Sequence, residues 1–270
     1  MPRGAEQDLR AAIGARLAAA GCVAPLEEAD ELLAAAADRV DLEELVARRE
    51  RGDPLAWVTG STRFLGATVR VRPGVYVPRP QTELLARRAV DRLPPQGSAA
   101  DLCTGSGAIA LALRRRRPRA RVVASDLDPV ACRCAADNGV EVYQGDLAEP
   151  LPPELRGRLD VVVAVAPYVP TGAIGFLPTD ARDHEPLGAL DGGPTGTDVL
   201  ERVVVAAAEW LRPGGSLLLE LGGDQDTALA RVLADTGFDR PERLEDEEGD
   251  LRGIFLRGGP RSRTGGGGAT

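Results

Sequence analysis

The chain has 270 residues, of which 43% are hydrophobic and 27% charged, and its formal net charge is −8. This composition is typical of a globular protein with one large and one small domain, and the acidic charge argues against a protein that coats long stretches of nucleic acid. No apolar run approaches the roughly 20 residues that a membrane-spanning helix needs, and the N-terminus lacks the apolar core of a signal peptide. We therefore expect a cytoplasmic protein.

The first part of the chain, residues 1–52, has the pattern of a small helical domain. Apolar residues recur at helical spacing in three stretches, residues 6–22, 25–37 and 42–51. Asp41 and Glu44 form a capping-box pattern at the start of the third stretch, and Gly52 ends it. None of these residues suggests chemistry. The sequence therefore predicts a separate module that recognises a macromolecular substrate.

Residues 53–83 break the helical pattern and read as a linker. Residues 62–64 and 68–71 have the alternation of a short hairpin. Further on, Pro78 and Pro80 flank Arg79, and two prolines stiffen the backbone on both sides of that side chain. We expect this linker to lie across a site in the following domain.

Strands and helices alternate over residues 84–258, which predicts an α/β fold. Several strands are nearly continuous apolar runs, as in parallel strands that are buried on both faces. The pattern favours a doubly wound, mainly parallel sheet that ends in an antiparallel hairpin near residues 253–256. The glycine-rich tail, residues 259–270, is expected to be disordered. The expected strands cover residues 99–103, 121–126, 141–146, 160–166 and 216–221, and the helices 107–116, 130–138, 198–211 and 227–236.

A glycine-rich turn follows the first of these strands. It begins with Asp101 and contains Gly105 and Gly107, which let the backbone approach a ligand closely. Asp126 stands about 20 residues further on, at the end of the next strand, where an acid binds ribose hydroxyls. The glycines alone would also fit NAD. Because S-adenosylmethionine has an ammonium group and no phosphate, Asp101 favours that cofactor over a dinucleotide.

Asp146 closes the third strand and suits a hydrogen bond to an adenine amino group. The alternative is structural: Asp101 caps its loop and Asp146 ends its strand. The cysteines and the single histidine point to no metal site. Cys132 and Cys134 are two residues apart on an expected helix and face different ways, and His184 has no visible nucleophile partner. The sequence thus predicts a bound S-adenosylmethionine and no metal.

A second candidate site, Val165-Ala166-Pro167-Tyr168, follows the fourth strand. With it, the sequence from about residue 52 to residue 225 resembles the release factor glutamine methyltransferases, which methylate the glutamine of a Gly-Gly-Gln motif. The helical N-terminal domain fits that family as well. The matching stretches are residues 52–54 with Gly60, residues 63–66, 78–83 and 101–107, residues 185–186, 189–193 and 213–215, Glu220 and Gln225.

The resemblance implies a class I methyltransferase fold and an N-methyltransferase that uses S-adenosylmethionine. It implies a peptide chain release factor as the protein partner, without membrane contact or direct sequence-specific binding of nucleic acid. The four residues 165–168 would form the catalytic motif. The implied cofactor-binding residues are Arg79, Thr82, Glu83, Asp101, Cys103, Thr104, Gly105, Gly107, Asp126 and Asp146.

The catalytic motif departs from the family pattern, which is Asn-Pro-Pro-Tyr. An amide nitrogen is a poor nucleophile because its lone pair is delocalised. As the resemblance implies, the family orients the NH₂ group with two acceptors, the Asn side-chain carbonyl and the next backbone carbonyl. Ala166 keeps its carbonyl, but Val165 supplies no acceptor. The loss of one such hydrogen bond costs about 1–3 kcal/mol, or one to two powers of ten in rate.

Three interpretations follow from this departure. The enzyme methylates a different acceptor, such as a small molecule or a nucleobase amine. Alternatively it methylates glutamine slowly, with water or another residue as the acceptor, or it is a catalytically weak scaffold that binds the cofactor or a translation factor. A nucleobase enzyme would have to flip its base, and the acidic charge and the lack of a DNA-recognition domain count against it. The arginine run at residues 114–117 either complements a helix dipole or contacts RNA.

Overall fold

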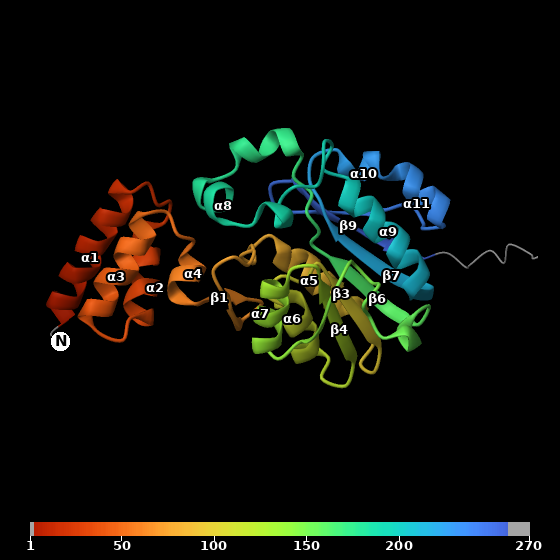
Figure 1. Ribbon diagram of the computed structural model, residues 1–270, viewed down its shortest axis with the longest axis horizontal. Coiled ribbons are helices and arrows are strands. Elements are labelled where there is room, and N and C mark those ends of the chain that lie inside the picture. Colours follow the sequence, from red (N-terminus) through yellow and green to blue (C-terminus); the bar gives the residue numbers. More distant parts are fainter. Residues whose placement is uncertain (1–2, 259–270) are drawn as a thin grey trace, which may run out of the picture.

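The structure is a computed structural model that describes residues 3–258, in which a helical bundle stands beside an α/β domain (Figure 1). The tail expected at residues 259–270 lies outside the described residues. Within residues 3–258, no helix has both the length and the apolar character needed to cross a membrane. The division into a helical and an α/β part agrees with the expected fold class.

The helical bundle has a small apolar core of its own. Within the described residues, α1 (Arg3–Ala19), α2 (Pro25–Ala35) and α3 (Arg39–Glu50) pack together as the three expected helices. Their inward faces bury Leu17, Leu32 and Val46, which are completely shielded from solvent. A buried ion pair between Arg49 of α3 and Glu28 of α2, at 2.6 Å, ties two of the helices together.

The expected start of the third helix is wrong by a few residues. The N-cap of α3 is Asp38, whose carboxylate accepts hydrogen bonds from the backbone N–H groups of Val40 (2.8 Å) and Asp41 (2.9 Å). Asp41 lies inside the first turn and accepts a hydrogen bond from Ala37 N at 2.8 Å. Asp38 and Asp41 lie within one turn of each other, so the sequence pattern alone allows either of them to be the N-cap.

The linker holds two structured pieces between the bundle and the sheet. The short helix α4 (Leu55–Thr59) was not expected, while the hairpin β1 (Ser61–Phe64) and β2 (Ala67–Arg70) confirms the predicted one. Trp57 of α4 is buried, and its ring N–H donates to the carbonyl of Val75 at 2.9 Å. The next stretch of chain is therefore anchored before it reaches the α/β domain.

The sheet has the strand order of a doubly wound fold. In the described residues it is seven-stranded, with the order β5-β4-β3-β6-β7-β9-β8, and the antiparallel pairs are β7–β9 and β8–β9. The other neighbours pair in parallel. The order reverses between β3 and β6, and ligands bind at the carboxyl ends of strands at such a switch point. The strands are β3 (Ser98–Leu102), β4 (Arg121–Asp126), β5 (Glu141–Gln144), β6 (Leu159–Ala164), β7 (Leu211–Glu220), β8 (Glu242–Glu245) and β9 (Leu251–Arg257).

Helices cover both faces of the sheet (Figure 1). On one face, α5 (Thr82–Arg92), α6 (Ala108–Arg116) and α7 (Pro129–Asp137) pack against the side chains of Val161, Val163 and Leu218. On the other face, α9 (Asp198–Trp210) and α11 (Ala230–Thr236) pack against Val162 and Leu217, and the single-turn helix α10 (Gln225–Ala228) precedes α11. Both faces of the parallel strands are thus buried, as the continuous apolar runs predicted.

Some elements differ from the expectation. Helix α5 was not predicted, and its first residues, Thr82 and Glu83, had been assigned to the linker. The helix expected over residues 227–236 is divided at Leu229 into α10 and α11. A further unexpected segment carries three short helices, the 3₁₀ turns η2 (Thr171–Phe176) and η3 (Leu187–Ala189) and α8 (Thr179–His184) between them. Helices this short carry too few residues for a clear apolar period.

Candidate active site

A cavity of about 360 Å³ opens at the carboxyl ends of β3, β4, β5 and β6, on the switch point of the sheet. The linker forms part of its wall through Val75, Tyr76 and Pro78, as expected for a segment lying across a site. Most residues predicted from the sequence lie on this wall. They are Thr82, Asp101, Cys103, Thr104, Gly105, Asp126, Asp146, Val165 and Pro167.

Asp101 is the most deeply buried acid on the wall, at 2% exposure. Its Oδ2 accepts hydrogen bonds from the Thr104 hydroxyl (2.6 Å) and from the backbone N–H of Ala110 in α6 (3.0 Å). Burial raises the pKa of Asp101 to about 7, although these two hydrogen bonds oppose the rise. A carboxylate held in this way is poised to bind a cation.

Asp126 ties the glycine-rich turn to the next strand. Its Oδ2 accepts from the backbone N–H of Gly105 at 2.8 Å and its Oδ1 from that of Asp128 at 2.9 Å. Burial raises the pKa of Asp126 above its ordinary value. The turn also holds Cys103 in a left-handed conformation, with φ of 56°, and burial raises the pKa of its thiol. The two carboxylates predicted from spacing therefore meet at one edge of the cavity.

Two leucines on the wall were not predicted as site residues. Leu127 follows Asp126 and is 70% exposed, while Leu147 follows Asp146 and has a left-handed backbone with φ of 45°. A leucine directly after an acid at a strand end is the sequence signal that could have identified them. Asp146 itself forms an ion pair with Arg202 of α9, and both side chains line the cavity. This end of the cavity is thus apolar on two sides with a charged pair at its rim.

Gly107 does not line the cavity, and its predicted contact with the cofactor stays untested. It is the N-cap of α6, with φ of 79°, and a Cβ atom there would lie 2.9 Å from Cγ2 of Val140 and 3.0 Å from Cβ of Ala135. The residue is therefore required for close packing between α6 and the α7–β5 region and for a backbone that disfavours a side chain.

Arg79 and Glu83 also lie off the cavity wall, and direct contact of either with the cofactor stays a prediction. Arg79 donates to Glu185 at 2.6 Å and stacks over the ring of Tyr76, 5.0 Å from its centre. Glu83 accepts from the backbone N–H of Leu65 at 2.7 Å and pairs with an arginine one helical turn later. Both side chains are committed to fixing the linker.

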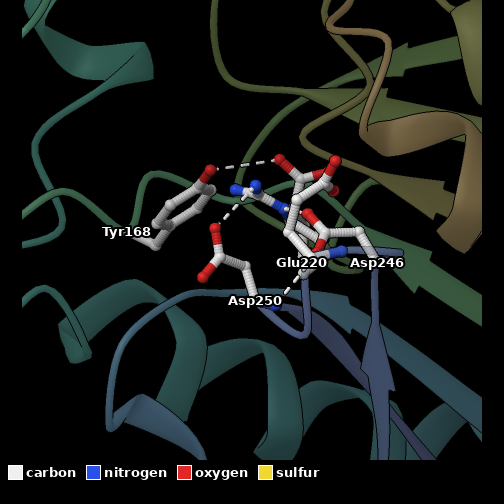
Figure 2. Close-up of polar contacts among 6 residues, drawn as sticks. Tyr168, Glu220, Asp246 and Asp250 are labelled. Atoms are coloured by element: carbon white, nitrogen blue, oxygen red, sulfur yellow. Dashed lines mark hydrogen bonds and ion pairs between the residues drawn. The ribbon is translucent and has the colours of Figure 1, made fainter.

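Some of the four residues of the catalytic motif line the cavity, and others pack into the core of the domain. Val165 and Pro167 line the cavity, whereas Ala166 is 1% exposed and packs into the sheet core. The ring of Tyr168 turns toward the end of β7, where its hydroxyl donates to Oε1 of Glu220 at 3.2 Å (Figure 2). Burial raises the pKa of Tyr168. Pro167 therefore lines the cavity, and the tyrosine ring does not.

A second loop fixes the backbone of the motif. The side-chain amide of Gln225 donates to the carbonyls of Tyr168 (2.7 Å) and Gly196 (3.1 Å). Gly196 has φ of 76°, and a Cβ atom there would overlap the Tyr168 carbonyl oxygen. Gln225 entered the sequence prediction only through the family resemblance, and the structure places its side chain against the backbone of the motif.

Comparison with known proteins assigns the chain to a family. No protein-family profile matches it. It is 43% identical over 242 residues to a release factor glutamine methyltransferase of Mycolicibacterium smegmatis, which covers 81% of this chain and 84% of that protein. It is 42% identical to the one of Moorella thermoacetica, over 82% of this chain and 79% of that protein. The chain belongs to the release factor glutamine methyltransferase family. The resemblance inferred from the motifs is therefore confirmed.

The fold comparison agrees with this assignment. A methyltransferase from Pyrococcus furiosus superposes with a TM-score of 0.54, at 17% sequence identity, over 73% of this chain and 91% of that one. Likeness at that identity concerns the fold alone, and it confirms the class I methyltransferase architecture. As a member of the release factor glutamine methyltransferase family, the chain is an S-adenosylmethionine-dependent enzyme of the protein-glutamine N5 type.

Proposed function

We propose that this chain transfers a methyl group from S-adenosylmethionine to the side-chain amide nitrogen of the glutamine in the Gly-Gly-Gln motif of a peptide chain release factor. The observation that carries the proposal is its 43% identity, over most of its length, to a release factor glutamine methyltransferase. The position of the cavity at the switch point of the sheet supports it. Such a substrate would be met in the cytoplasm.

The chemistry of the wall fits S-adenosylmethionine. Asp101 would hold the ammonium group of the methionine part, and Asp126 the ribose hydroxyls. Leu127 and Leu147 would pack on the two faces of the adenine ring, with Asp146 close to its amino group. Cys103, Thr104, Gly105 and Thr82 would complete the contact surface.

The acceptor amide would enter beside Val165 and Pro167. The cofactor supplies an electrophilic methyl group, so the protein has to hold the amide nitrogen in line with it and exclude water. The Ala166 carbonyl, which the family pattern uses as one acceptor, is present in this chain. The Asn side chain that would supply the other acceptor is replaced by Val165.

The experiment that tests the function is methyl transfer from labelled cofactor to purified release factor. We expect the label on the glutamine of Gly-Gly-Gln, located by mass spectrometry, and none on a release factor that carries Ala at that position. Binding of S-adenosylhomocysteine without any labelled glutamine would reject the proposed acceptor. In that case, assays on small-molecule and nucleobase amines would test the remaining enzyme alternative.

The helical domain, residues 1–52, would recognise the body of the release factor. Its core is separate from those of the sheet, and none of its residues lines the cavity among those described. A variant without residues 1–52 should lose at least about 100-fold in rate on the whole release factor, the kinetic equivalent of ~3 kcal/mol of substrate binding. It should bind S-adenosylhomocysteine as the full chain does and retain activity on a short Gly-Gly-Gln peptide.

Calorimetry with S-adenosylhomocysteine is the control that the remaining domain is folded. Equal rates on the whole release factor with and without residues 1–52 would refute a role of the bundle in recognition.

A further inference from the structure

The ion pair between Asp146 and Arg202 lies on the wall of the cavity. Asp146 follows β5 by two residues, Arg202 belongs to α9, and Nη2 of Arg202 donates to Oδ2 of Asp146. Within residues 3–258, Arg202 is the only positively charged residue of this wall, and its other charged residues are all aspartates. A single guanidinium thus stands among acids where a cationic cofactor has to bind.

Helix α9 turns one face toward the cavity at this point. Val199 stands three residues before Arg202, which puts both side chains on the same face of the helix, and both line the cavity. Burial raises the pKa of the Cys103 thiol on the same wall, and the Arg202 guanidinium acts against that rise. The guanidinium is therefore close enough to the inner wall to act on a bound ligand.

Arg202 is the group that holds the Asp146 carboxylate. Among the described residues, the Asp146 side chain is hydrogen-bonded to Arg202 alone. Asp126 differs, because its two carboxylate oxygens accept from backbone N–H groups, which fix it without a side-chain partner. The Asp146 side chain is 37% exposed, so without the ion pair it would be free to turn into solvent.

The ion pair leaves one acceptor and further donors unused. Oδ1 of Asp146 and both Nε and Nη1 of Arg202 make no hydrogen bond within the part of the chain that the structure describes. A carboxylate oxygen beside a guanidinium N–H presents an acceptor next to a donor. Adenine has the reverse order, since its amino group is a donor and the ring nitrogens on either side of it are acceptors. The ion pair is therefore complementary to an edge of adenine.

We propose that Arg202 is a specificity-determining residue for the adenine ring of the cofactor. Its guanidinium holds the Asp146 carboxylate toward the amino group of the ring and donates to a ring nitrogen beside that group. This inference rests on the cofactor placement given under the proposed function, in which Leu127 and Leu147 enclose the ring. The carbonyl of Leu147 accepts from the Ser125 hydroxyl at 2.5 Å, which fixes the backbone directly after Asp146.

Such a pair rejects a base that carries oxygen in place of the amino group. In hypoxanthine, that oxygen would face the Asp146 carboxylate, and two acceptors would meet without a proton between them. A site built around a hydrogen bond discriminates strongly against a ligand that cannot make it, because the group of the protein is left unpaired. The discrimination depends on Arg202, since a carboxylate free to turn away would no longer oppose the oxygen.

The test compares two ligands in the full-length chain. S-adenosylhomocysteine carries adenine, and S-inosylhomocysteine carries hypoxanthine. Calorimetry measures both affinities for the natural chain, for Arg202→Ala, for Asp146→Asn and for the variant with both changes, and melting temperatures report folding. The matched control is Arg156→Ala. It removes an arginine of similar exposure that pairs with Glu209 and lies off the cavity wall.

The natural chain should bind S-adenosylhomocysteine at least about thirtyfold more tightly than S-inosylhomocysteine. Arg202→Ala should weaken binding of the adenine ligand at least about tenfold and change binding of the hypoxanthine ligand less than about threefold. Asp146→Asn should remove the preference, because a side-chain amide can donate to the hypoxanthine oxygen. For S-adenosylhomocysteine, the loss in the variant with both changes should be smaller than the two single losses combined, because Arg202 acts through Asp146. Arg156→Ala should change neither affinity.

The failures of the inference and of the proposed function differ. If Arg202→Ala weakens binding of both ligands by the same factor, or leaves both unchanged, Arg202 does not read the base, and the inference falls while the cofactor placement stands. The same holds if the natural chain binds both ligands equally, or if the two single losses are additive. If the natural chain does not bind S-adenosylhomocysteine, the cofactor placement is wrong, and the inference falls with it.

Discussion

Replacing Asp101 by Asn should weaken S-adenosylhomocysteine binding at pH 8 by about 10–100-fold and, at the same time, stabilise the free protein. Affinity is lost because the hydrogen bond between the Asp101 carboxylate and the ammonium group of the ligand joins two charged groups, and such a bond contributes about 1.5–3 kcal/mol. The gain follows because the carboxylate is buried at 2% exposure without a cation, whereas the amide keeps the shape and can still accept from Thr104 and Ala110.

The pKa of Asp101 gives the effect on stability its pH dependence. Burial raises this pKa from 3.8 to about 7, so the folded chain binds more protons than the unfolded chain between these values. The free energy of unfolding therefore falls as pH rises through this window. The stabilisation by Asp101→Asn should grow from about pH 4 to about pH 7 and then stay constant. In the natural protein, the affinity for the cofactor should decrease below pH 7, because the Asp101 carboxylate becomes protonated.

Melting temperatures at pH 4.5, 6 and 8, with calorimetry at the last two, measure both effects. Asp91→Asn makes the same chemical change at an exposed position of α5 and should alter neither quantity. If Asp101→Asn destabilises the free protein at pH 8, or binds S-adenosylhomocysteine as tightly as the natural chain, Asp101 is a structural cap and not the ammonium ligand.

The features that could be predicted from the sequence are those written locally in it. Apolar runs marked the strands, and the glycines after Asp101 with the acid at Asp126 marked the loop that forms one end of the cavity. Each of these depends on residues in one strand and the turn after it. The doubly wound, mainly parallel sheet could be predicted because parallel strands joined by helices have few permitted arrangements.

The features of the site that could not be predicted depend on contacts between distant parts of the chain. Arg79 has the same local sequence whether it faces the cavity or Glu185, which lies 106 residues away. Tyr168 meets Glu220, 52 residues further on, only because β6 pairs with β7 and so brings the segment after β6 to the end of β7. Spacing along the chain encodes neither of these contacts.

Val165 sets the rate of the natural enzyme in our interpretation. Its side chain lines the cavity but can accept no hydrogen bond, so in the proposed reaction the glutamine amide relies on the Ala166 carbonyl. A single acceptor constrains the amide less than the two acceptors of the family pattern would. Without that constraint, the nitrogen spends less time on the line of attack.

The double change Val165→Asn with Ala166→Pro should therefore raise the rate of glutamine methylation at least about tenfold, the kinetic equivalent of ~1.4 kcal/mol. The gain should appear in the single-turnover rate and leave S-adenosylhomocysteine affinity unchanged, because the restored bond orients the acceptor and does not touch the cofactor. A natural chain that already matches an Asn-bearing relative would show that Val165 is no handicap. A double variant that binds the cofactor but gains nothing would show that the natural acceptor is not a glutamine amide.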